Sequence, residues 1–291
     1  MKDFLGREIN YLRISITDRC NLRCKYCMPE PIDKVAMQEI LSSEEIVQVC
    51  EIAAEFGIRY IKITGGEPLV RLGCADLIKM IKDTPGIEKV TMTTNGVLLK
   101  EHLDDLLAAG LDAVNISLDT ARPDEFKEIT GVDAFDKVFQ GIEAALAAGL
   151  QVKINSVLMA DMNADEWHDL ALLAKKYPLD VRFIEMMPIG YGKENRGVSN
   201  ERLKELLAEK YILIKDDRQH GYGPAEYFNI EGFRGSVGFI SAMHGKFCNK
   251  CNRIRLTSTG FLKPCLCYGE GAELKADLRS GNLQAVRRSI K

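Results

Sequence analysis

Short apolar runs alternate with helical patterns from residue 11 to about residue 210. The apolar runs predict strands over residues 11–16, 59–63, 90–94, 113–118, 151–158 and 180–186. Between them apolar residues recur with the i, i+3, i+4 spacing of helices that pack on a sheet, as in Ile46, Val49, Cys50 and Ala53. Repeated β/α units of this kind predict a parallel sheet with right-handed crossovers.

The two faces of the predicted strands differ in polarity. In the first strand Leu12 and Ile14 alternate with Arg13 and Ser15, and the second, fourth and fifth strands repeat the pattern. A doubly wound sheet with helices on both faces should be apolar on both. One polar face favours a barrel with helices outside and a polar cavity inside. We therefore predict an α/β fold, a partial (β/α)6 TIM-like barrel that is not fully closed.

The regular alternation stops after about residue 210. Residues 212–214, 225–230 and 236–240 predict short antiparallel strands, and a cysteine-rich loop and two short helical stretches follow. We expect residues 1–210 to form the barrel. Residues 211–291 are expected to form a C-terminal α+β cap over its mouth.

Composition excludes several classes of protein. The chain has 39 basic and 42 acidic residues, which argues against a dedicated nucleic-acid binder. No run approaches 18 apolar residues, and the first ten residues are too charged for a secretion signal, so we expect a cytoplasmic protein without membrane contact. In such a protein nine cysteines indicate metal or redox chemistry rather than disulfides.

The first cysteine cluster directly follows the first predicted strand. Cys20, Cys24 and Cys27 form C-x3-C-x2-C, and three thiolates can hold a [4Fe–4S] cluster with one iron left open for a small molecule. The alternative is a structural zinc site, which needs a fourth ligand and normally uses paired C-x2-C knuckles.

The segment TGGEP follows the second strand, where glycines let backbone approach a ligand. Together with C-x3-C-x2-C it resembles the radical S-adenosylmethionine (SAM) superfamily, in which a reduced cluster cleaves SAM into methionine and a 5′-deoxyadenosyl radical. The resemblance implies cofactor contacts at Tyr26, Gly66, Glu67, Ser117 and Met187.

A second cysteine trio lies near the C-terminus. Cys248, Cys251 and Cys265 form C-x2-C-x13-C, and spacing alone leaves open a zinc knuckle completed by Cys267 or His244. The other histidines, His102, His168 and His220, show no ligand spacing and are expected on the surface. The absence of G-x4-G-K-[ST] excludes a P-loop.

The segment FCNKCNRIRLTSTGFLKPCL resembles the auxiliary-cluster segment of the GTP 3′,8-cyclases that open molybdenum cofactor biosynthesis, and LRISITDRC, NISLD and RFIEMMPIG extend the resemblance. It implies that the second trio holds another [4Fe–4S] cluster, whose open iron binds guanine. The implied contacts to GTP are Arg13, Lys62, Thr93, Lys153, Arg253 and Arg255. The alternation of polar residues independently places the first four of these on the inner face, where several buried cations imply an anion. For any one of them the alternative is an internal salt bridge to Glu67, Asp119 or Glu185.

The reaction implied by the resemblance is cyclisation of GTP to (8S)-3′,8-cyclo-7,8-dihydroguanosine 5′-triphosphate, a radical lyase reaction without an assigned acid–base residue. The implied partners are an electron donor of the reductase or flavodoxin type and the downstream cyclic pyranopterin monophosphate synthase. Alternatives are another two-cluster radical SAM enzyme, such as a peptide-modifying one, and a zinc-stabilised binding module. Iron and sulfide analysis separates the zinc alternative from the others.

The last residues depart from this family. GTP 3′,8-cyclases typically continue and end in Gly-Gly, whereas this chain ends at Arg287-Arg288-Ser289-Ile290-Lys291. A narrow cavity admits glycine backbone where side chains would clash. The expectation is that the chain as given binds both clusters, SAM and GTP but cyclises GTP poorly.

Overall fold

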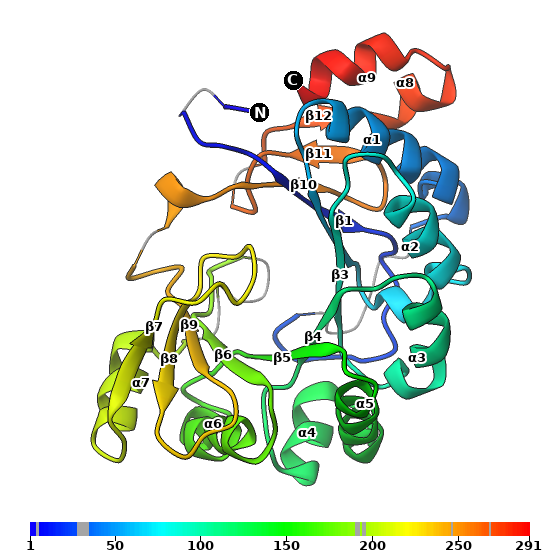
Figure 1. Ribbon diagram of the computed structural model, residues 1–291. Helices are drawn as coiled ribbons and strands as arrows, with labels where there is room; N and C mark the ends of the chain where they lie inside the picture. The colour runs from blue at the N-terminus through cyan, green and yellow to red at the C-terminus, as the bar shows by residue number, and fades with distance from the viewer. Residues whose placement is uncertain (4–5, 28–34, 190–192, 194–195, 246, 268) are drawn as a thin grey trace.

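One twelve-stranded sheet, curved into an open barrel, organises the molecule (Figure 1). The computed structural model describes residues 1–3, 6–27, 35–189, 193, 196–245, 247–267 and 269–291. The strand order is β12-β11-β10-β1-β2-β3-β4-β5-β6-β9-β8-β7. The strands are β1 Tyr11–Ser15, β2 Tyr60–Thr64, β3 Lys89–Thr94, β4 Ala113–Ser117, β5 Gln151–Ser156, β6 Asp180–Ile184, β7 Leu213–Asp216, β8 Glu226–Ile230, β9 Val237–Ile240, β10 Arg253–Leu256, β11 Phe261–Lys263 and β12 Ala272–Glu273.

Helices cover the outer face of the sheet, as Figure 1 shows. They are α1 Ser43–Glu55, α2 Cys74–Lys82, α3 Leu99–Ala108, α4 Pro123–Thr130, α5 Phe135–Ala147, α6 Trp167–Lys176, α7 Asn200–Ala208, α8 Lys275–Arg279 and α9 Leu283–Ile290. A capping box at α1, in which Ser42 and Glu45 exchange hydrogen bonds, fixes where that helix begins. None of the helices within the described residues is both long and apolar enough to cross a lipid bilayer.

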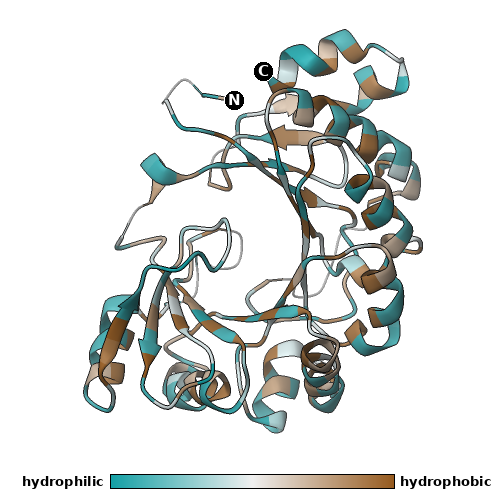
Figure 2. Cartoon of the chain, in the orientation of Figure 1, coloured by the Kyte–Doolittle hydropathy of each residue, from teal (hydrophilic) through white to brown (hydrophobic). Residues whose placement is uncertain are grey.

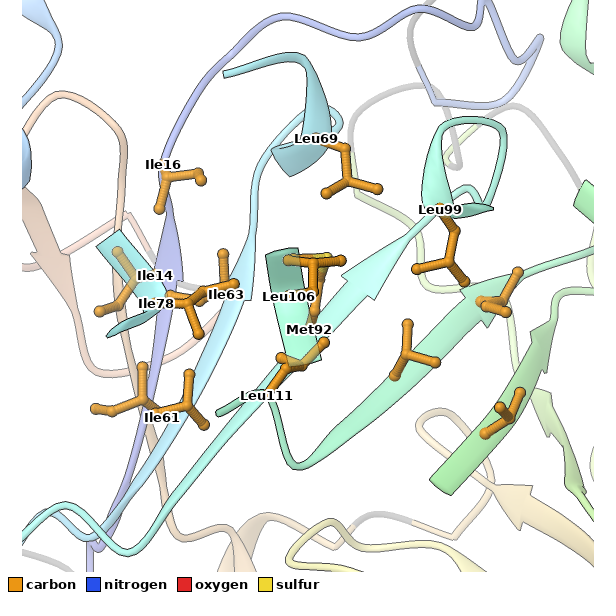
Figure 3. Close-up of a cluster of buried hydrophobic side chains, with 14 of the residues drawn as sticks. Ile14, Ile16, Ile61, Ile63, Leu69, Ile78, Met92, Leu99, Leu106 and Leu111 are labelled. Carbon is orange, nitrogen blue, oxygen red and sulfur yellow. The ribbon is translucent and has the colours of Figure 1, made fainter. Parts of the chain in front are cut away.

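The core lies between the sheet and these helices. Ile14 and Ile63 of the strands lie beside Ile78 of α2, and Met92 of β3 lies beside Leu106 of α3 (Figure 3). All of these side chains are fully buried, and Figure 2 shows the teal, hydrophilic residues of the helices on their outward sides. The apolar face of the strands therefore points outward, and the polar face lines the barrel, as the alternation predicted.

The C-terminal strands extend the barrel sheet at both of its edges. β9 pairs in parallel with β6, and β10 pairs in parallel with β1. The prediction of short antiparallel strands in this region is confirmed for β7, β8 and β9, and the parallel pairing of β9 with β6 adds to it. β10 and β11, of four and three residues, fall in the region predicted as a cysteine-rich loop, because they lie between the cysteines of the second trio. The domain boundary at residue 210 stays a prediction.

Candidate active site

Strand register places the inward polar residues side by side. Arg13 of β1 is level with Lys62 of β2 on one side and with Arg255 of β10 on the other. Farther round, Asn115 of β4 is level with Lys153 of β5. A belt of polar and positively charged side chains thus follows the inside of the barrel.

This belt lines a cavity of about 630 Å³ inside the barrel. Five of the six predicted GTP-binding residues line it: Arg13, Lys62, Thr93, Lys153 and Arg253. The sixth, Arg255, does not line the cavity. It lies between Arg13 and the second cysteine trio, and burial together with Arg13 and Arg253 lowers its pKa to about 10.

Arg182 of β6 is a cavity residue that the sequence interpretation missed. Its Nη2 donates a hydrogen bond of 2.5 Å to Oδ1 of Asn155, its neighbour across the β5–β6 pair. Gly238 on β9 makes room for it, since a Cβ there would lie 3.0 Å from Arg182 Cγ and 2.8 Å from the Tyr227 ring. The same alternation, applied to the sixth strand, places Asp180 and Arg182 on the inner face.

The cavity is strongly electropositive. Within the described part of the chain, the buried Nε atoms of Arg13, Arg182 and Arg253 have no hydrogen-bond partner. Burial, followed by Arg182, Arg13, Lys153 and Arg253, lowers the pKa of Lys62 well below its usual value. Cations left unpaired in a low-dielectric site are costly, so this site is built for an anion of several charges.

The three cysteines of the first trio follow the carboxyl end of β1. Cys27 N–H donates to the Cys24 carbonyl at 3.0 Å. Burial, Asp119 and the two neighbouring thiols raise the pKa of Cys24 to about 12. Among the described residues no group of three His, Cys, Asp or Glu side chains is spaced for one metal ion. A four-iron cluster holds its cysteines farther apart than a single ion does, so three adjacent thiols on one segment fit it.

The glycines of TGGEP allow two segments of the chain to approach each other closely. A Cβ on Gly66 would lie 2.2 Å from the Arg19 carbonyl oxygen, and one on Gly65 would lie 2.7 Å from that of Thr17. Gly66 N–H donates to Thr17 and Glu67 N–H to Arg19, at 2.8 and 2.7 Å. The glycines therefore let this segment approach the cysteine segment, and the expected approach of the backbone to a ligand stays a prediction. A contact of Gly66 with a cofactor remains a prediction.

Glu67 joins the ends of β2 and β3. Its buried carboxylate accepts hydrogen bonds from Leu69 N–H, the Thr94 hydroxyl and Asn95 N–H, at 3.0, 2.7 and 2.6 Å. Burial raises the pKa of Glu67. Among the described side chains, Glu67 forms no salt bridge with a cation of the cavity, so it does not supply the negative charge that these cations lack. Glu67 instead fixes the strand ends beside the first trio.

The remaining predicted cofactor residues lie at the same carboxyl-terminal edge. The Tyr26 hydroxyl donates to Asp119 at 2.5 Å, which fastens the cysteine segment to the residues after β4. Ser117 ends β4 and Met187 follows β6, and both are partly exposed. Parallel strands bring these ends together around the mouth of the barrel.

The second trio lies at the opposite edge. Cys248 and Cys251 precede β10, which is parallel to β1, and Cys265 follows the antiparallel β11. Cys251 N–H donates to the Cys248 carbonyl at 3.1 Å. Cys251 and Cys265 lie close enough to favour the charged form of Arg255.

The two candidate fourth ligands differ. His244 Nδ1 lies 3.1 Å from Oε1 of Glu185, whose carboxylate also accepts from the backbone N–H of His244. Cys267 N–H donates to Cys265 Sγ at 3.5 Å. His244 is therefore engaged by Glu185, and Cys267 is the residue that adjoins the trio.

Two family models together match most of the chain. Residues 14–174 match the Radical SAM superfamily, and residues 179–291 match Molybdenum Cofactor Synthesis C. A protein of Clostridium perfringens strain SM101 named GTP 3′,8-cyclase is 49% identical over 283 residues, 97% of this chain and 88% of its own length. Proteins of the same name from Heliobacterium modesticaldum and Thermodesulfovibrio yellowstonii are 50% and 46% identical, over 97% and 100% of this chain and 88% and 92% of theirs.

The chain belongs to the GTP 3′,8-cyclase family of radical SAM enzymes. Membership confirms the resemblance read from the cysteine motifs, and it implies SAM and a [4Fe–4S] cluster as cofactors. It also places the enzyme in molybdenum cofactor biosynthesis.

Solved structures agree with the family's fold. Streptococcus suis SuiB bound to S-adenosylmethionine superimposes with a TM-score of 0.67 at 17% identity, over 90% of this chain and 62% of that one. Native anSMEcpe with bound AdoMet superimposes with a TM-score of 0.61 at 17% identity, over 89% of this chain and 75% of that one. At this identity the likeness shows the fold alone, and it confirms the predicted partial barrel.

Proposed function

We propose that this chain cyclises GTP between C3′ and C8, with the triphosphate held by the cations of the barrel cavity. The observation that carries the proposal is the set of inward Arg13, Lys62, Arg182 and Arg253, which have no carboxylate partner among the described residues. Of the predicted phosphate contacts, only Lys153 has a carboxylate partner within the described part of the chain, Asp180, at 3.7 Å. A triphosphate supplies the missing negative charge, and arginine binds it through two parallel hydrogen bonds.

The first trio would hold the cluster to which SAM binds. When bound, this pair supplies a 5′-deoxyadenosyl radical, which removes a hydrogen atom from the substrate. Tyr26 and Glu67 fasten the segments that carry the cysteines, and we infer that Gly66, Ser117 and Met187 contact SAM from the strand ends. The protein orients the cofactor and excludes water.

The second trio, Cys248, Cys251 and Cys265, would hold a second [4Fe–4S] cluster that binds guanine. Arg253 and Arg255 alternate with buried apolar residues along β10, which begins just after the first two cysteines of this trio. Arg253 faces the cavity, and Arg255 lies near both the trio and Arg13. GTP spanning this distance would have its base at the cysteines and its phosphates among the cations.

Two partners follow from this proposal. The first cluster requires an electron donor of the reductase or flavodoxin type. The cyclised nucleotide would pass to cyclic pyranopterin monophosphate synthase.

Anaerobic turnover with GTP, SAM and a reductant tests the function. The reconstituted chain should bind about eight irons, as two four-iron clusters require, and should release 5′-deoxyadenosine together with a cyclised nucleotide. Zinc in place of iron, or 5′-deoxyadenosine release that does not depend on GTP, would overturn the proposal.

A further inference from the structure

The loop between β7 and β8, residues 217–225, forms a strap that reaches into the barrel (yellow in Figure 1). All of its residues line the cavity. The Tyr222 ring stacks on Tyr60 of β2 with centroids 3.5 Å apart, and its carbonyl accepts a hydrogen bond from Asn252 Nδ2 at 3.3 Å. The strap therefore ties the β7–β9 edge to the opposite side of the cavity.

His220 fastens the other end of this strap. Its Nδ1 lies 2.9 Å from Oδ2 of Asp180, and its Nε2 lies 2.7 Å from Oδ2 of Asp216. Its ring stacks on Tyr227 at 4.0 Å, and its side chain is only 10% exposed. The expectation of a surface histidine is wrong, because the strap folds inward.

The carboxylate that His220 holds is the one that faces Lys153. Lys153 Nζ lies 3.7 Å from the same Oδ2 of Asp180. The strap also passes close to this ammonium group, since a Cβ on Gly221 would lie 3.2 Å from Nζ. The two side chains share one carboxylate oxygen, and His220 has the shorter contact.

We propose that His220 is a positioning residue for GTP, which engages Asp180 so that the Lys153 ammonium remains available to a phosphate. This inference rests on the proposed function of the cavity. Without His220, Asp180 pairs with Lys153 alone and cancels one of the charges that face the triphosphate. The affinity of a neutral ligand without phosphates does not depend on the charge of Lys153, so it should not change when His220 is removed.

Equilibrium binding of GTP and of guanosine to the full reconstituted chain, by calorimetry, tests the proposal. We expect His220→Ala to weaken GTP binding about tenfold, the loss of one charge-assisted contact, and guanosine binding less than twofold. Adding Asp180→Asn to His220→Ala should restore most of the affinity for GTP, because it removes the competing charge. His220→Gln gives a second, folded background for the same comparison, and His102→Ala is the matched control.

The outcomes are distinct. Equal losses for GTP and guanosine, or no rescue by Asp180→Asn, mean that His220 only holds the strap, which overturns this inference alone. Wild-type chain that binds GTP no better than guanosine overturns the phosphate site, and this inference with it.

Discussion

The two cysteine trios lie at opposite edges of one barrel and in opposite electrostatic surroundings. Buried carboxylates flank the first trio: Asp119 raises the pKa of Cys24, and Glu67 raises that of Cys20, each adding to the effect of burial. Guanidinium groups flank the second: the pKa of Arg7 is raised against the effect of burial mainly by its ion pair with Asp3, and then by Cys251 and Cys265.

This difference in charge indicates which ligand binds at each edge of the cavity. SAM carries a sulfonium and an ammonium group, which suit the edge with carboxylates. GTP carries several negative charges, which suit the belt of cations and the guanidinium groups beyond it. Complementary charges of this kind weaken binding in the reversed arrangement, with GTP beside the carboxylates and SAM beside the cations, more than they strengthen binding in the correct one.

The largest effect is expected when a cysteine is removed from the first trio. Cys24→Ala should abolish SAM cleavage, because two thiolates cannot hold a cluster with one open iron. Release of 5′-deoxyadenosine under anaerobic conditions measures this. Cys74→Ala, which removes a buried thiol at the start of α2, is the control and should cleave SAM normally.

Removing a cysteine from the second trio should give a different defect. Cys251→Ala should retain iron and the spectrum of the first cluster, yet lose guanine binding and cyclisation. Iron content and nucleotide products, measured on the same sample, check both parts. Normal GTP turnover by this variant would show that the second trio holds no substrate-binding cluster.

Removing a cation should distinguish the two ligands. Lys153→Ala and Arg255→Ala should each weaken GTP binding by about 1.5–3 kcal/mol, the value of a charge-assisted hydrogen bond, while SAM binding is unchanged. The loss should be smaller for guanosine, and calorimetry with each ligand measures it. Lys79→Ala, at an exposed ion pair with Asp83, is the control. Equal losses for GTP and guanosine would contradict a phosphate role.

The pH dependence of GTP binding between pH 7 and 9 should follow Lys153. Burial and Arg182 lower the pKa of Lys153 to about 8, so this side chain is charged below pH 8 and neutral above it. The Kd for GTP should therefore rise between pH 7 and 9, by up to about tenfold, and GTP binding at pH 8 should take up protons. Calorimetry in buffers of different ionisation enthalpy measures the uptake. In Lys153→Arg the rise should disappear, and an unchanged profile would exclude Lys153 as its source.

The smallest expected effect concerns the carboxylate edge. Glu67→Gln keeps the size of the side chain but weakens the three hydrogen bonds that Glu67 accepts. We expect a modest loss of SAM affinity, about 1 kcal/mol, with GTP affinity unaffected. If GTP binding fell equally, the two edges of the barrel would not act separately.

Alternation was enough to predict six strands and the inward direction of Arg13, Lys62, Thr93 and Lys153. β10 shows the same alternation over its four residues but was assigned to the cysteine-rich loop that it follows. His220 was misjudged for another reason: the strap that carries it has no periodicity, and its burial depends on Asp180, Asp216 and Tyr227, which other strands supply. Contacts that distant segments create leave no local signal in a sequence.

β9 and β10 are consecutive strands, yet they lie on opposite flanks of the parallel sheet, next to β6 and β1. The twelve residues between them carry Cys248 and Cys251 across the seam that the barrel leaves open. During synthesis the first trio leaves the ribosome with its own β/α units, whereas the second is brought together by the later β10–β11 hairpin, which joins the barrel by pairing with β1, more than 200 positions earlier. Non-local pairing of this kind is slow to form. We therefore expect the closing of the seam to come late in folding, after the β/α units around the first trio have formed.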